Sequence, residues 1–189
     1  MKKKIILFVF LVVIVPGVIG YLATSYIIQL NPPPVKIVYK TTLPELPLQK
    51  WVLSQSSRCS PKQVKLIIQE CIRTDLPLLI LALISAESEF NPTAVSSKGA
   101  IGLGQIMFEH HMKALIGANI IKEKRDLFDV EANIQATHFI LKMFLRQSNG
   151  DVTKALERYL GGHDGAYQRK ILNNLANLYV VTSRKEEGK

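Results

Sequence analysis

Glu87 is the residue whose type and position best suit chemistry in this sequence. It lies near the end of an apolar run, residues 77–88, and the chain breaks at Asn91-Pro92 shortly afterwards. Burial disfavours the charged form of a carboxyl group, and so does the negative end of a helix dipole. Both effects raise the pKa of Glu87, and a carboxyl group that stays protonated can act as a general acid. Glu89 is expected to be an ordinary solvated carboxylate.

A glycine-rich segment follows this break, with glycines at positions 99, 102 and 104. Glycine lets a backbone turn sharply or approach another group closely. Gln105 and Met107 come directly after it and are expected to line the space that Glu87 faces. A plainer interpretation is also open, in which the segment is a tight hairpin packed on a core helix with Glu87 at its rim.

Helical spacing and capping residues predict a mainly helical domain around this acid. Ser60 can cap a helix that has Pro61 at its first position, and the run at residues 77–88 is apolar on every face, as in a central helix. Asp129 and Asp151 can cap two later helices. Helices are predicted after the central one at residues 105–117, 130–147, 152–160 and 167–180.

The amino-terminal part divides into two further segments. Residues 1–30 start with three lysines and then carry no charge, which predicts either a membrane anchor or a cleaved signal segment. The length of the uncharged stretch, residues 5–30, favours the retained anchor, and both alternatives export the remainder. Residues 31–50 are rich in proline and predict a stiff linker. The globular domain is expected at residues 51–189.

Composition narrows the classes of partner and cofactor. The formal net charge of +9 suits an anionic surface such as lipid headgroups or a cell-wall polymer. The positive charges are scattered, so no nucleic-acid partner is expected. No zinc-ligand spacing occurs among the four histidines, and neither a metal nor a cofactor is expected. Cys59 and Cys71 lie too far apart along the predicted helix for a disulfide.

The segment from Glu87 to Met107 resembles the signature of SLT-type lytic transglycosylases, which have a lysozyme-like fold. The resemblance covers roughly residues 58–180. The matching residues are Glu87-Ser88, Phe90, Asn91-Pro92, Ser96, Gly99-Ala100, Gly102-Leu103, Gln105 and Ile106-Met107. The resemblance implies cleavage of the peptidoglycan glycan between N-acetylmuramic acid and N-acetylglucosamine. It places the catalytic acid on Glu87 and substrate contacts on Ser88, Gln105, Met107 and Tyr159.

The sequence departs from the family pattern at four positions. Gly104 stands where the family usually has Met, and Phe108 where it often has Pro. Thr137 replaces a frequent Gly, and Leu160 replaces the Asn of the third motif, although Tyr159 before it is retained. These changes bear on substrate fit and rate more than on the reaction itself.

The number of well-placed carboxyl groups distinguishes two enzymes with this fold. Glycosidases usually use two carboxylates. Only Glu87 is well placed here, and the resemblance implies a lytic transglycosylase in which it acts first as acid and then as base, leaving a 1,6-anhydro ring. A muramidase of the same fold and a poorly active wall-binding assembly factor stay open as alternatives. We expect a monomer at the bacterial inner membrane with its domain in the periplasm, or secreted there after signal cleavage; a secretion or conjugation apparatus is an open further partner.

Overall fold

The computed structural model of this protein describes residues 43–56 and 58–183. The predicted anchor or signal segment at residues 1–30, and the linker up to residue 42, lie outside the described residues. Among the helices that are described, none is both long and apolar enough to cross a membrane.

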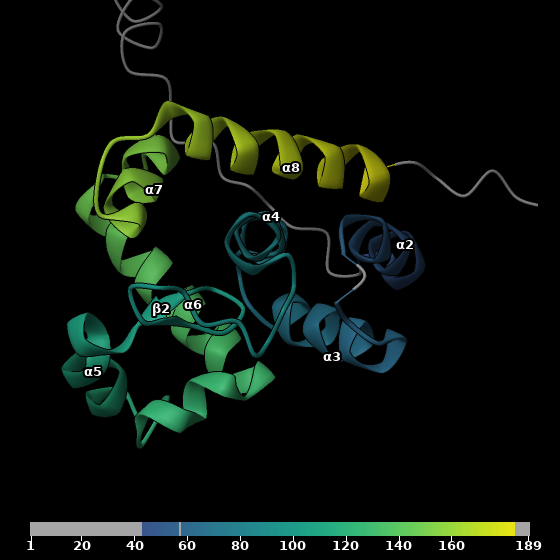
Figure 1. The fold of residues 1–189 in the computed structure, drawn as a ribbon. Coiled ribbons are helices and arrows are strands. Elements are labelled where there is room, and N and C mark those ends of the chain that lie inside the picture. Colours follow the sequence, from purple (N-terminus) through teal and green to yellow (C-terminus); the bar gives the residue numbers. More distant parts are fainter. Residues whose placement is uncertain (1–42, 57, 184–189) are drawn as a thin grey trace, which may run out of the picture. The chain divides into compact units, whose positions relative to one another are not determined.

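The described chain is mainly helical, as the sequence predicts, with one short hairpin (Figure 1). The elements in chain order are α2 (Glu45–Gln55), α3 (Pro61–Ile72), α4 (Pro77–Ser88), β1 (Ala100–Ile101), β2 (Ile106–Met107), α5 (Phe108–Gly117), the 3-10 helix η1 (Lys124–Phe128), α6 (Val130–Gln147), α7 (Val152–Leu160) and α8 (Gly165–Ser183).

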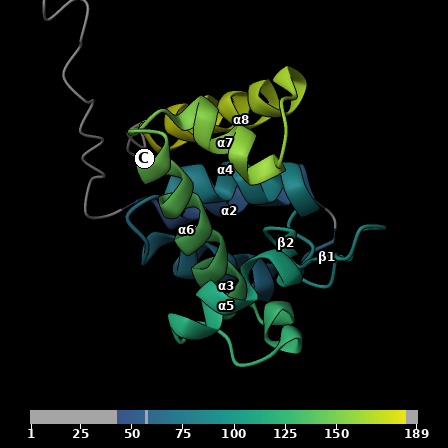
Figure 2. The same cartoon turned by 90° about the vertical axis from the view of Figure 1, so that its left-hand side faces the viewer.

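Helix α4 is the central element, because its side chains are apolar all round and need cover on every side. Every residue from Pro77 to Ser85 is buried. Figure 1 shows α4 end-on, with α8 along one side of it and α2 and α3 nearby, and Figure 2 shows α8 running over α4 from a second direction. This cover brings residues of α8 against the end of α4 that carries Glu87.

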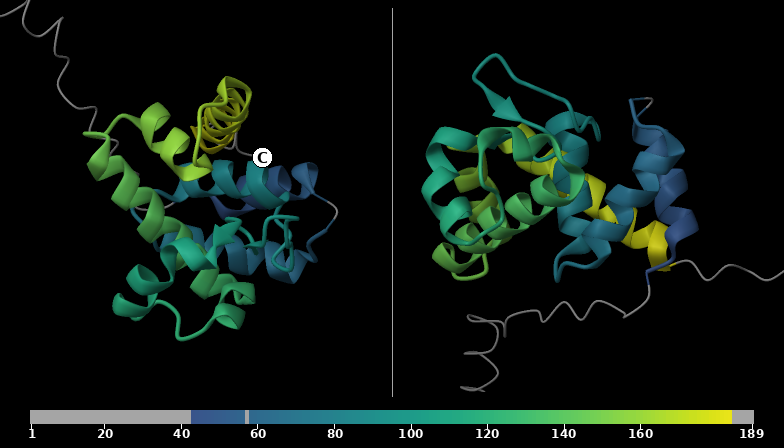
Figure 3. Two further views of the ribbon diagram at one scale, coloured as in Figure 1. Left: turned by 60° about the vertical axis from the view of Figure 1, so that its left-hand side comes forward. Right: turned by 90° about the horizontal axis from the view of Figure 1, so that it is seen from below.

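The buried side chains form two hydrophobic clusters that meet at α6. The larger cluster joins α2, α3, α4 and α8, and it includes Ile134 and Leu141 of α6. The smaller cluster lies under the hairpin, α5 and η1, and it includes Ile140 of α6. Tyr159 of α7 packs against both clusters. The hairpin, with Ala100 paired to Met107, stands out from the helices beside α4 (Figure 3).

The predicted helix caps are confirmed. Ser60 accepts a hydrogen bond from the backbone N–H of Gln63, whose side chain in turn accepts from the Ser60 backbone. Asp129 accepts from the backbone of Ala132 at the start of α6, and Asp151 accepts from Lys154 at the start of α7. Each bond satisfies an amide that has no partner within its own helix.

Four features differ from the sequence predictions. Residues 45–50 belong to helix α2 rather than to the linker, and Leu48 in this stretch is fully buried. Gln105 to Met107 form a turn and a strand, so α5 begins only at Phe108. The 3-10 helix η1 was not predicted, and α8 extends beyond both predicted ends.

Both cysteines are free, as predicted from their spacing, and both are buried. The Cys59 thiol donates to the backbone carbonyl of Phe90. Cys71 lies in the larger hydrophobic cluster, where burial raises the pKa of its thiol. His138 of α6 is half-buried, and its Nε2 lies within hydrogen-bond distance of the Asp75 carboxylate, which also pairs with Lys142.

Candidate active site

Glu87 lies in the last turn of α4, where the helix ends abruptly. Glu89 and Phe90 both adopt the left-handed conformation, with φ of 50° and 60°. This conformation is costly for a bulky residue such as Phe90, so surrounding contacts must hold it. The Phe90 ring is fully buried with Trp51 edge-on at 6.0 Å, and its carbonyl accepts from the Cys59 thiol. The turn that fixes the direction of Glu87 is therefore anchored by Trp51 of α2 and by Cys59, which precedes α3.

The carboxyl group of Glu87 is held by a residue of α8. The Tyr167 hydroxyl donates a hydrogen bond to Oε1 of Glu87. Lys170, one turn further along α8, donates from Nζ to the Ala86 carbonyl at 3.3 Å. Burial raises the pKa of Glu87 to about 6, although the Tyr167 hydrogen bond and the Lys170 charge both act to lower it. The expected direction of the shift is confirmed, and burial is its main cause.

Tyr159 connects α7 to the hairpin rather than to Glu87 directly. Its hydroxyl donates to the Gly104 carbonyl at 2.8 Å. Burial, followed by the negative charge of Glu87, raises the pKa of the Tyr159 hydroxyl. Glu87 therefore lies close enough for its charge to act on Tyr159, whose hydroxyl binds Gly104. The same two causes raise the pKa of the Tyr167 hydroxyl, which stays a hydrogen-bond donor.

Asn133 of α6 holds the glycine-rich segment in place through its side-chain amide. Its side-chain oxygen accepts from the Gly104 N–H at 2.8 Å, while its amide donates to the carbonyls of Ile101 at 3.1 Å and Leu127 at 2.7 Å. Asn133 is 1% exposed, so its side chain satisfies these three backbone groups in a place that water does not reach. A Cβ on Gly102 would stand 2.3 Å from the Asn133 amide nitrogen, which explains the glycine.

Three of the predicted substrate-contact residues, two in the hairpin and one in α4, differ in burial and in hydrogen-bond partners. The Gln105 amide donates to the Gly102 carbonyl at 3.0 Å and to Ala94 at 3.4 Å, and Gln105 itself has a φ of 49°. Met107 is half-buried at the end of β2. Ser88 is buried, and its hydroxyl donates back to the Ile84 carbonyl of its own helix at 3.4 Å. Gln105 is therefore held by its own loop, and Ser88 is held within α4.

Sequence reasoning missed Tyr167, Lys170 and Asn133. Tyr167 and Lys170 are three positions apart and so share one side of a helix, but nothing in the sequence pairs that side with Glu87. Asn133 sits among apolar residues of α6, and a buried polar residue in such a stretch was a usable signal for a specific hydrogen-bond role.

A cavity of about 760 Å³ lies elsewhere in the domain. It is lined by residues of α3 and α6 and by Thr74 and Asp75, which precede α4. These two residues lie at the opposite end of α4 from Glu87. The residues that the structure brings to Glu87 are instead Tyr167 and Lys170 of α8, with Tyr159 of α7 within reach of its charge.

What this arrangement can do is transfer a proton twice. A carboxyl group with a pKa of about 6 is protonated in part of the molecules near neutral pH, so it can give a proton and then take one back. Lys170 is the charged residue that acts on the pKa of Glu87 within the described part of the chain; no second carboxylate does so.

The comparisons with known proteins agree with this geometry. The family model described as Transglycosylase SLT domain matches residues 66–176. The match starts within α3 and ends within α8, so it includes Glu87, the hairpin, Tyr159, Tyr167 and Lys170, while α2 lies outside it. Neither the curated proteins nor the solved structures gave a match to this chain.

Proposed function

The chain belongs to the transglycosylase SLT domain family, and from this premise we propose that it is a lytic transglycosylase of peptidoglycan. The observation that supports this most strongly is Glu87 itself. It is a single carboxyl group with a pKa raised to about 6, at the end of a buried helix, and its charge acts on Tyr159, which binds the glycine-rich hairpin at Gly104.

The proposed reaction cleaves the bond between N-acetylmuramic acid and N-acetylglucosamine. Glu87 gives its proton to the bridging oxygen, and the bond from that oxygen to C1 of the muramic residue breaks. The N-acetyl group of the substrate stabilises the sugar cation. Glu87, now a carboxylate, takes the proton of the C6 hydroxyl, and O6 bonds to C1 to close the 1,6-anhydro ring. No water is consumed, so one carboxyl group suffices for both transfers.

Tyr167 has a defined part in this scheme. Its hydroxyl donates to Glu87, so it stabilises the carboxylate that exists between the two transfers. Gln105 and Met107 follow the turn at Gly104 and are proposed to contact the glycan there. Tyr159 holds this part of the hairpin in place, because its hydroxyl donates to the Gly104 carbonyl. Ser88 is also proposed to contribute to the substrate site. Its hydroxyl is bound to the Ile84 carbonyl of the same helix, α4.

Two alternatives make different demands on the same residues. A muramidase of this fold would need a second acid or a positioned water, and no second carboxylate acts on Glu87 within the described residues. A poorly active wall-binding factor is favoured by Leu160, which replaces the Asn of the third motif and is 42% exposed. The intact setting of Glu87, Tyr167 and Gln105 supports the enzyme instead.

We further propose that residues 5–30 hold the protein at the bacterial inner membrane with the domain in the periplasm, as a monomer. The support is the uncharged stretch after three lysines. Intact mass of the exported protein tests this. A mature chain that starts at Tyr21 or Tyr26 would replace the anchor by a cleaved signal and leave the proposed reaction unchanged.

The decisive experiment compares the parent protein with Glu87→Gln and Glu89→Gln on purified sacculi. Products are identified by mass spectrometry, because a hydrolysed end carries one more water than an anhydro end. General acid–base catalysis by one group is worth roughly 10²–10⁴-fold, so Glu87→Gln should release almost no anhydromuropeptides. Glu89 is 58% exposed and faces Arg58 at 3.7 Å, which makes Glu89→Gln the matched control. Hydrolysed ends from the parent would establish the muramidase, and an active Glu87→Gln would overturn the site.

A further inference from the structure

We propose that Lys170 is a positioning residue for both proton transfers, because it holds the end of α4 and keeps a positive charge beside Glu87. This inference rests on the proposed function of Glu87. The family resemblance assigned no role to Lys170, and the proposal comes from how α8 meets α4.

Three successive turns of α8 each donate a side-chain hydrogen bond to one of three successive residues of α4. Tyr167 donates to the carboxylate of Glu87, Lys170 donates to the Ala86 carbonyl at 3.3 Å, and the Asn174 amide donates to the Ser85 hydroxyl at 3.2 Å. The α8 positions are spaced by three and four residues, so they lie on one side of that helix. Lys170 is the member of this row that carries a charge.

The end of α4 lacks a cation of its own. No basic residue lies in the last turn of α4, and its terminal carbonyls carry partial negative charge. Ala86, whose carbonyl Lys170 binds, directly precedes Glu87. Glu89, the next carboxylate, faces Arg58. Lys170 therefore supplies from another helix the charge that is favourable at this terminus.

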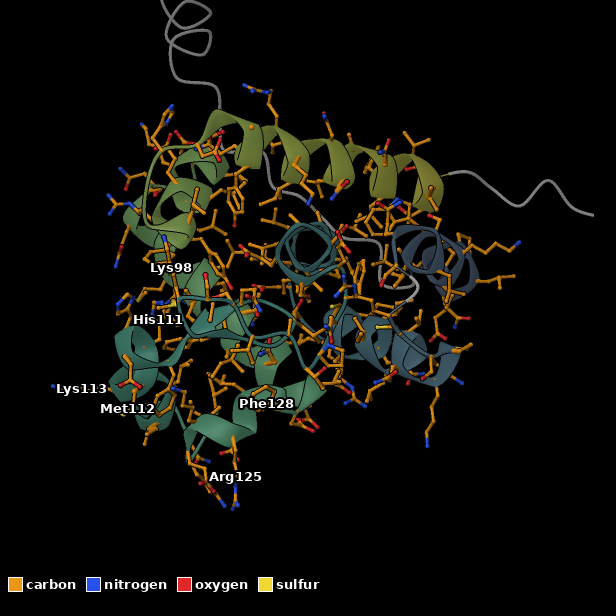
Figure 4. All side chains as sticks on the ribbon, in the orientation of Figure 1. Lys98, His111, Met112, Lys113, Arg125 and Phe128 are labelled. Atoms are coloured by element: carbon orange, nitrogen blue, oxygen red, sulfur yellow. The ribbon has the colours of Figure 1, made fainter. Side chains whose placement is uncertain are left out.

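Lys170 acts on Glu87 against the effect of burial. The groups that influence the pKa of Glu87 are the Tyr167 hydroxyl and the Lys170 ammonium group, both from α8, and both lower it. From α7, Tyr159 faces the site as a neutral hydroxyl. In the hairpin, residues 94–107, the one charged residue is Lys98. Lys98 lies in the turn before β1 and is exposed (Figure 4).

This charge matters most between the two transfers. Once the first proton has left, Glu87 is a carboxylate in a partly buried site, and burial makes that state costly. The Tyr167 hydrogen bond and the Lys170 charge offset this cost. Without Lys170, Glu87 would hold its proton more tightly, so the first transfer would be harder at a given pH and the acid form would persist to higher pH.

The test is the pH dependence of anhydromuropeptide release by the full-length protein and its variants. The alkaline limb of kcat/KM reports loss of the proton from Glu87. Lys170→Met should move this limb upward by about half a pH unit, since Lys170 is exposed and solvent screens its field. Lys170→Arg should keep the parent profile. Because salt screens an exposed charge, the difference between Lys170→Met and the parent should shrink at high ionic strength.

Lys113→Met is the matched control, because Lys113 extends from α5 away from the domain (Figure 4). A second readout does not depend on turnover. Carboxyl ¹³C resonances of Glu-labelled protein, with Glu87 assigned through Glu87→Gln, give its titration directly. If Lys170→Met lowers the melting temperature but moves neither the limb nor the titration of Glu87, Lys170 only caps α4 and the proposal is overturned. If the parent releases no anhydromuropeptides, the proposed function fails while the titration still decides the role of Lys170.

Discussion

Thr137 occupies the space into which a side chain on residue 104 would extend. A Cβ added to Gly104 would stand 2.0 Å from Oγ1 of Thr137 and 3.0 Å from the Tyr159 hydroxyl. The sequence presents Gly104 and Thr137 as two separate departures from the family pattern. The structure joins them. The family pattern has a large residue in the loop and glycine in the helix, whereas this chain has Gly104 in the loop and the larger Thr137 in the helix. These departures therefore compensate each other and do not argue for a damaged site.

This relationship predicts strong coupling between the two positions. Gly104→Met should destabilise the protein by about 1–3 kcal/mol, because the new side chain overlaps Thr137. Thr137→Gly should also destabilise it, through the glycine in α6 and the space left behind. The double variant should be more stable than the sum of the two effects, by about 0.5–3 kcal/mol. Denaturant unfolding of the four proteins measures this, and strict additivity would separate the two positions again.

The two tyrosines near the site should respond differently to loss of their hydroxyls. Tyr167 donates to the carboxylate of Glu87, and a hydrogen bond to a charged group is worth about 1.5–3 kcal/mol, or roughly ten- to a hundredfold in rate. Tyr159 donates to a backbone carbonyl, so Tyr159→Phe should mainly cost about 1 kcal/mol of stability. We expect Tyr167→Phe to lose more turnover than Tyr159→Phe.

The measurement is the initial rate of anhydromuropeptide release, with thermal melting as the folding control. Tyr167→Phe should in addition raise the pKa of Glu87, since it removes a contact that lowers it. Equal losses of turnover in the two variants, at equal stability, would show that the bond from Tyr159 to the hairpin matters as much as the bond from Tyr167 to Glu87.

Much of the helical framework was predictable because it is encoded locally. Ser60, Asp129 and Asp151 sit directly before helices and cap them, and these contacts need no information from the rest of the chain. Helix α2 was missed because Pro44 and Pro47 indicate an extended linker. Proline is tolerated in the first turn of a helix, and these two stand at its start. The buried face of α2, with Leu48, is set by packing against the other helices.

The role of α2 in the domain can be tested with two neighbouring leucines. Leu48 is fully buried, whereas Leu46 is 53% exposed. Replacing a buried leucine by alanine costs about 2–5 kcal/mol, whereas an exposed position usually changes stability by about 0.5 kcal/mol or less. Leu48→Ala should therefore melt at a clearly lower temperature than Leu46→Ala. Similar melting temperatures would mean that the first part of α2 does not pack on the domain, in line with the predicted linker up to residue 50.

The site was predictable to a smaller degree than the helices. Glu87 could be found because an acid at the end of an apolar helix is costly unless it has a purpose. Its partner Tyr167 could not be found, because their contact depends on how α8 crosses α4, and the two residues are far apart in the chain. The hydrogen bond from Asn133 to Gly104 depends in the same way on the approach of α6 to the hairpin.

The titration of Glu87 should also appear in the stability of the protein, with a sign that follows from its raised pKa. Its ordinary pKa is 4.5, and burial raises the pKa in the folded protein to about 6. Between these values the folded state binds more protons than the unfolded state, so the free energy of unfolding falls as the pH rises through this window. A shift of this size corresponds to about 2 kcal/mol, since one pKa unit is about 1.4 kcal/mol.

Glu87→Gln cannot titrate and should escape this loss. Its stability relative to the parent should rise by about 2 kcal/mol from about pH 4 to about pH 7, with most of the change between the two pKa values. Urea unfolding of both proteins at several pH values measures the difference. Glu89→Gln serves as the control, because Glu89 is 58% exposed beside Arg58. If the curves for Glu87→Gln and the parent run parallel across this range, Glu87 is ordinary in its acidity, and a general acid must be sought elsewhere in the chain.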